Sequence, residues 1–369
     1  MTLETPRWIN RILVACATAM VVIGGFGLHM TGLKADWMAY YAAGNFLIDH
    51  QISNIYDINA MKSWQSQIIG SNVALFMYAP AYSILFVPIA LLPVQAARLV
   101  WLVIGVAASI AAAKLSTRWT RLSFPISLLA LYAFPPMVYS LVAGQISAIS
   151  LLIFAIVAGM EWHKMDGFLP GMITGLAFYK PQMLIPIFMY WLIRRRWRSL
   201  AGLGFSALMV LFISVLISPD ATLAYFQFSR QFMELSENAT KTGANASIYA
   251  LHPWAGILTG MGILIVIIFL AQREPDRYSY AMLWLAPILV TPYIVVYDLL
   301  LLALPLSFLI PLISRDRLLQ AAVVLVWITP LLAIAILSTR PVTFSALGLF
   351  GVCAWRFYKN PRLLGDQKN

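Results

Sequence analysis

The chain has 369 residues, of which 61% are hydrophobic and 11% are charged, and its 25 Lys and Arg outnumber its 14 Asp and Glu. A soluble domain needs a polar exposed face, so this composition excludes one and indicates a polytopic membrane protein whose apolar surface is covered by lipid. The basic residues lie between apolar runs and no nucleic-acid-binding motif accompanies them, so they indicate membrane topology and not nucleic-acid binding.

A series of apolar runs follows along the chain, and a run needs about 20 residues to cross a bilayer. The first, at 10–32, predicts a retained membrane span, because it is too long for a signal peptide and no small-x-small cleavage site follows it. The others lie at about 79–93, 96–115, 122–141, 145–162, 168–193, 199–218, 246–270, 279–295, 297–313, 317–338 and 341–357.

Two of these runs are not expected to cross as single helices. The run 79–93 is short and contains several prolines, which favours a re-entrant or interfacial helix. The run 168–193 carries Lys180 and Pro181 at its middle, which predicts two half-helices that meet in a hairpin. The sequence thus predicts a single all-α transmembrane domain over 1–369 with about ten crossings. Both termini are then cytoplasmic, together with most of the Lys and Arg.

This topology places two long loops outside, at 33–78 and 219–245. The first contains helix-like stretches near 38–50 and 58–69 that are rich in Tyr, Trp and Ile, and we expect amphipathic helices that lie on the outer face. An enzyme that works at the outer leaflet needs such loops to form a pocket, whereas a simple solute channel has less need of them.

Two charged residues are the main candidates for chemistry. Asp36 follows the first span, where partial burial would raise the pKa of its carboxyl and suit a general base; the alternative is the N-cap of a helix that starts near Trp37. Lys180 lies inside an apolar segment, where a charge is costly and usually functional. It suits a phosphate, unless it snorkels to a nearby interface.

Three further polar residues lie at outer ends of apolar runs. Gln145 can donate a hydrogen bond to a sugar or a phosphate, or it can start a helix. Asn245 precedes another apolar run, and Asp298 can be the N-cap of the helix that follows it. Asp298 can also be a structural partner of Lys180 or Arg340. The sequence contains no phosphate-binding Gly loop, zinc-ligand spacing, nucleophile elbow or haem motif, so no metal site is expected.

Short motifs in a fixed order resemble glycosyltransferase family 87 (DUF2029), a family of GT-C membrane glycosyltransferases. The resemblance spans nearly the whole chain, and one position, Ser147, departs from the Gly-Gln-x-Asn often found in the family. The motifs are Asp36-Trp-Met-Ala-Tyr-Tyr-Ala-Ala-Gly44, Ile55-Tyr56-Asp57, Phe76-Met-Tyr-Ala-Pro80, Pro88-Ile-Ala-Leu-Leu-Pro93 with Trp101, Gly144-Gln145-Ile-Ser147, Lys180-Pro181 leading to Arg194-Arg-Arg-Trp197, Asn245-Ala-Ser247, and Pro292 through Tyr297-Asp298-Leu299.

The resemblance implies a GT-C-like fold and an inverting transferase. Its donor would be a polyprenyl-phosphate sugar, often mannose, and its acceptor a lipid or a glycan. The reaction would occur at the periplasmic or outer face of the bacterial inner (plasma) membrane, without a nucleotide, metal or other cofactor. The acid after the first span is the family's general base, which maps to Asp36.

The same resemblance suggests roles for the other candidates. Lys180, with Arg98 behind it, would stabilise the charge of the leaving lipid phosphate. The aromatic residues near Asp36 would stack on sugar faces, and the polar residues would bind hydroxyls. The expected substrate-binding set is Trp37, Tyr40, Tyr41, Arg98, Gln145, Lys180, Gln182, Asn245, Tyr297 and Asp298.

Other functions use the same features. A transporter or flippase of a lipid-linked sugar would also need an intramembrane lysine and broken helices, although the chain has no internal repeat and has long outer loops. A glycan polymerase or ligase would take an oligosaccharide donor at the same leaflet. A non-catalytic scaffold would not need Asp36.

Overall fold

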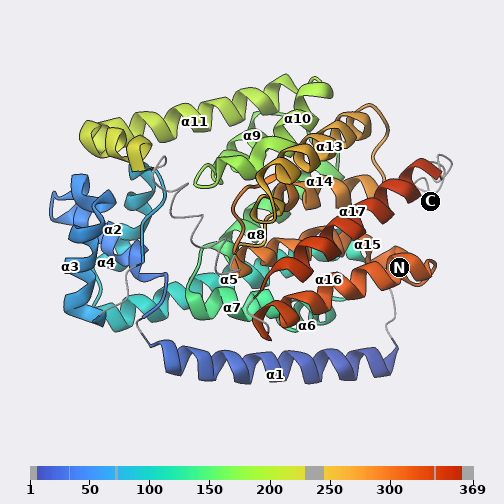
Figure 1. The fold of residues 1–369 in the computed structure, drawn as a ribbon, viewed down its shortest axis with the longest axis horizontal. Helices are drawn as coiled ribbons and strands as arrows, with labels where there is room; N and C mark the ends of the chain where they lie inside the picture. Colours follow the sequence, from blue (N-terminus) through green and yellow to red (C-terminus); the bar gives the residue numbers. More distant parts are fainter. Residues whose placement is uncertain (1–5, 33, 71–73, 229–244, 336–337, 360–369) are drawn as a thin grey trace.

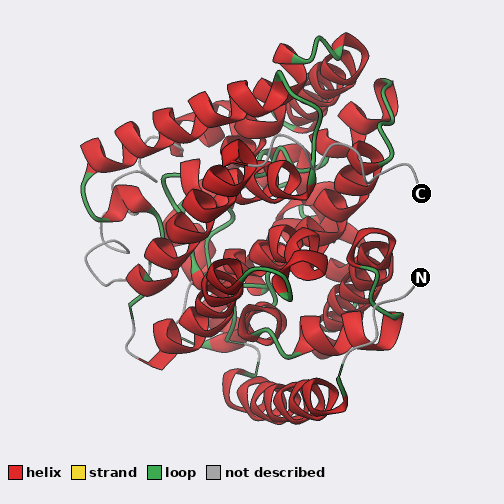
Figure 2. Ribbon diagram, turned by 90° about the vertical axis from the view of Figure 1, so that its right-hand side faces the viewer, coloured by secondary structure: helices red, strands yellow, loops and turns green. Residues whose placement is uncertain are grey.

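The structure is a computed structural model, and it describes residues 6–32, 34–70, 74–228, 245–335 and 338–359. Within these ranges the chain forms helices joined by short loops and contains no strand (Figure 2). The predicted all-α fold is therefore confirmed. Of the second long loop expected at 219–245, residues 219–228 are helical and 229–244 lie outside the described residues.

Five helical segments of the described chain are long and apolar enough to cross a membrane. They are α1 (Arg7–Thr31), α5 (Val94–Thr120), α11 (Trp197–Ile217), α13 (Pro253–Ala271) and Val296–Ile313, which joins η5 (Val296–Leu302) to α15 (Ala303–Ile313). The chain is thus a multi-pass membrane protein. The expected count of about ten crossings is supported for five or six, because the helices of the other apolar runs are too short or not apolar enough.

The sixth crossing depends on a bent pair of helices. The run 122–141 was expected to cross as one span, but it forms α6 (Phe124–Tyr132) and α7 (Pro135–Ala143), which are bent by 68°. Pro135 explains the bend, because it cannot continue the hydrogen bonds of α6 and it holds the preceding residue in an extended conformation. The other long helices are α8 (Ser147–Trp162), α14 (Arg277–Val290), α16 (Arg317–Ala335) and α17 (Arg340–Lys359).

The break predicted within 168–193 is present. The segment forms α9 (Phe168–Gly175), η3 (Pro181–Leu184) and α10 (Ile185–Ile193), with the interruption around Lys180. Its two ends lie together, because Arg196 Nη1 donates to the carbonyl of Met165 at 3.3 Å. The segment therefore reverses direction as a hairpin does. The short run 79–93 forms η2 (Pro80–Phe86) and α4 (Val87–Ala90).

The first long loop contains α2 (Met38–Ile48), η1 (Ile52–Tyr56) and α3 (Ile58–Ile69), and it gathers with α4 at one end of the molecule (Figure 1, left). The α3 helix buries only one face, as an amphipathic helix does. The α2 helix differs from this expectation, because it is buried on nearly every side. Gly44 permits this packing, since a Cβ there would lie 2.7 Å from the carbonyl oxygen of Phe86.

The opposite end holds the basic loops, the start of α1 and the end of α17 (Figure 1). Lys164 pairs with Glu274 at 2.9 Å, and Arg194 Nη1 donates to the carbonyl of Arg273 at 2.9 Å. The sequence had assigned these loops to a single side of the membrane. Their mutual contacts show that they do lie together.

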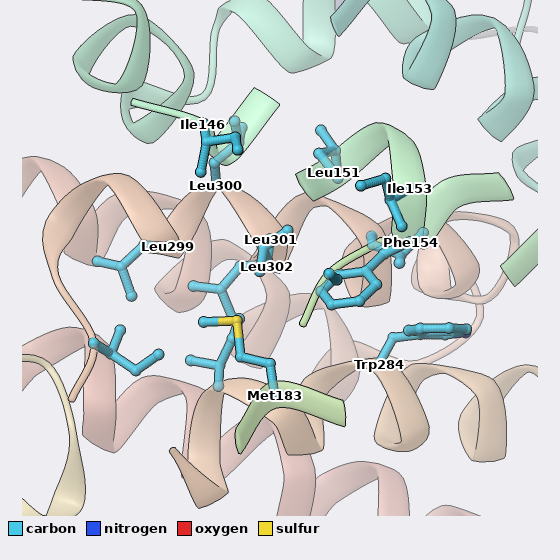
Figure 3. Close-up of a cluster of buried hydrophobic side chains, with 14 of the residues drawn as sticks. Ile146, Leu151, Ile153, Phe154, Met183, Trp284, Leu299, Leu300, Leu301 and Leu302 are labelled. Carbon is cyan, nitrogen blue, oxygen red and sulfur yellow. The ribbon is translucent and has the colours of Figure 1, made fainter. Parts of the chain in front are cut away.

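A buried apolar core joins the elements between these two ends. Side chains of α8, η3, α14 and η5 meet there, and they include Met183, Trp284 and the run Leu299–Leu302 (Figure 3). Met183 follows Lys180 by three residues, and Leu299 directly follows Asp298. The core therefore fixes the chain beside both charged residues.

The α9 and α11 helices cross so closely that glycine is needed on both. A Cβ on Gly202 would lie 2.0 Å from the carbonyl oxygen of Phe168, and one on Gly171 would lie 1.9 Å from that of Ser199. We expect Gly202→Ala to destabilise the protein by about 2 kcal/mol, because the helices must separate. Thermal unfolding of the detergent-solubilised protein should show a lower apparent Tm.

Gly204 provides the matched control, because it lies in the same helix and a Cβ there would meet nothing within 4 Å. Gly204→Ala should leave the apparent Tm unchanged or raise it slightly, since alanine favours a helix over glycine. Equal losses in both variants would show that the close crossing of the two helices does not explain the loss of stability.

Candidate active site

The Asp36 carboxylate lies between α1 and α2 and remains partly exposed. Its Oδ2 accepts a hydrogen bond of 2.7 Å from Gln145 Nε2, so its described partner is a side chain and not the N–H groups of α2. Burial raises the pKa of Asp36, although the Gln145 hydrogen bond and the nearby charge of Lys180 oppose this shift. A carboxyl with a raised pKa is a suitable general base.

The turn between α7 and α8 brings Gln145 to Asp36. Gly144 forms this turn with a φ of 66°, a conformation that favours glycine. A Cβ at this position would also lie 2.2 Å from Arg98 Nη1 and 2.6 Å from Trp37 Cβ. Both the backbone angle and the packing therefore require glycine in the Gly-Gln motif.

Arg98, on α5, is buried behind this turn. Its Nη2 donates to the carbonyls of Val142 at 2.6 Å and Leu141 at 3.3 Å, and its guanidinium lies 5.5 Å from the Trp37 ring centroid. A cation at the carboxyl end of α7 stabilises that helix end. Arg98 was expected to support Lys180 against a phosphate. Its described contacts join α5, α7 and the start of α2, and its role toward a phosphate stays a prediction.

The three aromatic residues expected to stack on sugars are buried against protein. Trp37 and Tyr40 are 0% and 3% exposed, and the Tyr41 hydroxyl donates to the carbonyl of Leu92 at 2.9 Å. The Tyr40 ring stacks on Phe86 at a centroid distance of 4.8 Å. This packing differs from an open sugar platform and makes these residues part of the wall behind Asp36.

Lys180 lies at the interruption of the hairpin and forms an ion pair with Asp298. The side chains are 17% and 4% exposed, and Asp298 Oδ2 also accepts from the backbone N–H of Val295 at 3.2 Å. Lys180 Nζ lies 5.4 Å from the ring centroid of the half-buried Tyr297. Of the two partners considered for Asp298, the structure selects Lys180. Gln182, in η3, is half-buried.

Asn245 binds backbone groups of the segment that leads into η5. Its Nδ2 donates to the carbonyl of Pro292 at 3.2 Å, and its Oδ1 accepts from the N–H of Ile294 at 3.0 Å and of Ser247 at 2.9 Å. Asn245 was expected to bind a sugar hydroxyl. These contacts hold the segment that leads to Tyr297 and Asp298, and the sugar-binding role of Asn245 stays a prediction.

Two tyrosines of the site were not among the expected residues. The Tyr78 hydroxyl lies 3.1 Å from that of Tyr40, and the Tyr179 hydroxyl donates to Ser150 Oγ at 2.6 Å. The Tyr78 and Tyr179 ring centroids are 5.4 Å apart. Tyr78 lies within the motif Phe76–Pro80, and Tyr179 directly precedes Lys180, and these positions were the only available signal.

The structure therefore gathers a carboxylate, an amide and a cation from distant parts of the chain. Asp36 and Gln145 are 109 residues apart, and Lys180 and Asp298 are 118 apart. Asp36, Gln145, Lys180 and Tyr297 all keep some exposure. This arrangement can accept a proton at one point and stabilise negative charge at another. In the described ranges, no three His, Cys, Asp or Glu side chains are grouped as a metal site.

Comparison with known proteins identifies the family. The model of glycosyltransferase family 87 matches residues 76–292, a segment that includes Gln145 and Lys180. No curated protein and no solved structure matches the chain. The family match covers more than half of the chain and confirms the resemblance found in the sequence, so the protein belongs to glycosyltransferase family 87.

Proposed function

We propose that the protein transfers a hexose, with mannose as the first choice, from a polyprenyl-phosphate sugar to a hydroxyl of a lipid or glycan acceptor. The observation that carries this proposal is the partly exposed carboxylate of Asp36 within the electrostatic influence of Lys180. A transferase with a lipid-phosphate donor needs both groups: a base for the acceptor hydroxyl and a cation for the leaving phosphate.

In this mechanism the acceptor oxygen attacks the anomeric carbon while the bond from that carbon to the phosphate oxygen breaks. The hydroxyl proton passes to the Asp36 carboxylate, and the phosphate leaves with the bonding electron pair. Attack opposite to the leaving group inverts the anomeric centre. The raised pKa of Asp36 strengthens it as a proton acceptor, provided that it is ionised before the reaction.

Lys180 would stabilise the phosphate by exchanging partners. In the structure its charge is compensated by Asp298, which limits the cost of a cation in an apolar segment. A donor phosphate would bind the same ammonium group. This group suits a phosphate because its charge is compact. Tyr297 lies beside Lys180 and lines this position.

A transfer assay tests the proposal. The purified protein is placed in liposomes with a lipid extract as acceptor and either radiolabelled polyprenyl-phosphate mannose or nucleotide-linked mannose. We expect label to move to the acceptor from the lipid donor only, and not with heat-denatured protein. Transfer from the nucleotide sugar would overturn the donor class. Unmodified donor that appears in the opposite leaflet, without product, would favour a flippase.

We also propose that the site faces the periplasm or cell exterior, with both chain ends cytoplasmic in a bacterial inner membrane. Ser53, near the site, and Met165, in a basic loop, are both exposed. In a Cys16→Ser background, a membrane-impermeant thiol reagent should label Ser53→Cys in intact cells and Met165→Cys only after permeabilisation. The opposite pattern would reverse the orientation. The Cys16 change is needed because Cys16 is exposed, whereas Cys353 is buried.

A further inference from the structure

The hydrogen bonds around Gln145 form a directed chain that ends on the carboxylate of Asp36. The Tyr40 hydroxyl donates to Gln145 Oε1 at 2.6 Å, and Gln145 Nε2 donates to Asp36 Oδ2 at 2.7 Å. A primary amide has one acceptor end and one donor end, and the hydroxyl that donates to Oε1 and the carboxylate that accepts from Nε2 favour the same orientation. If the amide were reversed, its oxygen would face the carboxylate and its NH₂ would face the tyrosine hydroxyl.

Tyr40 is itself held firmly in place. Its ring packs between neighbouring aromatic residues, with centroid distances of 4.8 Å to Phe86 and 5.4 Å to Trp101, and its hydroxyl lies 3.1 Å from that of Tyr78. Because a hydroxyl bonded at both sides in a packed wall cannot turn freely, it fixes the amide of Gln145 more strongly than solvent would.

We infer that Gln145 is a positioning residue whose amide, oriented by Tyr40, holds Oδ2 of Asp36 and leaves Oδ1 to meet the acceptor hydroxyl. This inference rests on the proposed role of Asp36 as the base. In the part of the chain that the structure describes, the carboxylate has no hydrogen-bond partner at Oδ1. The acceptor should therefore approach Asp36 from the side away from Gln145.

The pH dependence of the carboxyl gives a direct test. A hydrogen bond donated to a carboxylate favours its ionised form, so loss of the Gln145 amide should raise the pKa of Asp36. Because the base must be ionised, the acidic limb of the pH–rate profile should then move to higher pH. Other ionisable groups also interact electrostatically with the Asp36 carboxyl, and the test must leave them in place. They are Lys180, Tyr40, Tyr139, Tyr293 and Tyr297, of which only Tyr40 is substituted in one of the variants below.

Two readouts are measured on Gln145→Leu and Tyr40→Phe. The first is the acidic limb of transfer activity. The second needs no activity: a hydrophobic carbodiimide modifies protonated carboxyls, and mass spectrometry of the Asp36 peptide gives the pH of half-modification. We expect both to shift upward by about one unit in Gln145→Leu, equivalent to a tenfold change in protonation. The shift in Tyr40→Phe should be smaller, because the amide is retained.

The double variant adds a third criterion. If Tyr40 acts only through Gln145, Tyr40→Phe combined with Gln145→Leu should shift no further than Gln145→Leu alone. Tyr132→Phe is the matched control, because it removes a tyrosine hydroxyl that binds Ser109 on a different helix pair. It should move neither readout.

The outcomes separate this inference from the proposed function. An unchanged half-modification pH in Gln145→Leu would overturn the positioning role, even in an active enzyme. Lack of modification of Asp36 at every pH would contradict an accessible Oδ1. A shifted half-modification pH in a protein that transfers no sugar would retain the positioning role and reject the transferase.

Discussion

Asp36→Asn should lower kcat for sugar transfer by about 10²–10⁴-fold, the contribution typical of a general base. Asparagine has nearly the same shape, and its amide oxygen can still accept from Gln145 Nε2, so the site should keep its geometry. The lost property is the ability to take the acceptor proton. Initial rates at saturating donor and acceptor measure kcat, and the KM for the donor should change little.

Asp49→Asn is the control for this change. Asp49 is an exposed acid just after α2, so it lies in the same loop as Asp36 but outside the site. The variant should transfer sugar at the wild-type rate. Equal rates for Asp36→Asn and the wild type would overturn the assignment of the base, and equal losses in both variants would point to a general charge effect.

Lys180→Gln should lower kcat by about 10²–10³-fold, because the leaving phosphate loses the cation that stabilises its charge. The KM for the lipid donor should also rise, since the phosphate is present in the ground state. The variant has a structural effect as well. It leaves the nearly buried Asp298 without its partner, which costs about 3 kcal/mol. Rates must therefore be measured on protein shown to be folded.

A charge swap separates the chemical effect from the structural one. In the double variant Lys180→Asp with Asp298→Lys, the ion pair can form in the reverse direction and should recover much of the apparent Tm. Transfer should remain low, because the cation has moved to η5. Lys62→Gln, at an exposed lysine of α3, should affect neither property. Recovery of transfer in the swapped protein would reject Lys180 as the phosphate ligand.

Elementary rules predicted how the hairpin and the charged residues are placed. A lysine and a proline inside an apolar run predicted an interruption, because neither suits a continuous membrane helix, and the structure breaks the run there. The distribution of basic residues predicted which loops share a side. The same argument put Asp36, Gln145, Lys180 and Asp298 at one end, where the structure joins them in two bonded pairs.

Other features depend on tertiary packing that no local pattern records. The composition of α2 suggested a surface helix, but its small residues let α4 and η2 cover it. No sequence pattern indicated that Arg98 binds the carboxyl end of α7. The bend between α6 and α7 also divides into two short helices a run that was expected to cross as one span. The local sequence does not show whether a polar side chain faces a substrate or a neighbouring helix.

The distance along the chain between Lys180 and Asp298 has a consequence for biosynthesis. The lysine leaves the ribosome 118 residues before its carboxylate, which at typical rates of synthesis is an interval on the order of 10 s. A lysine in an apolar segment is costly to insert, by up to about 3 kcal/mol at the centre of a membrane helix, so water, lipid headgroups or the insertion machinery must solvate it during this time. A chain that terminates before Asp298 keeps that lysine uncompensated. We therefore expect a prematurely terminated chain to be less stable in the membrane than the full chain.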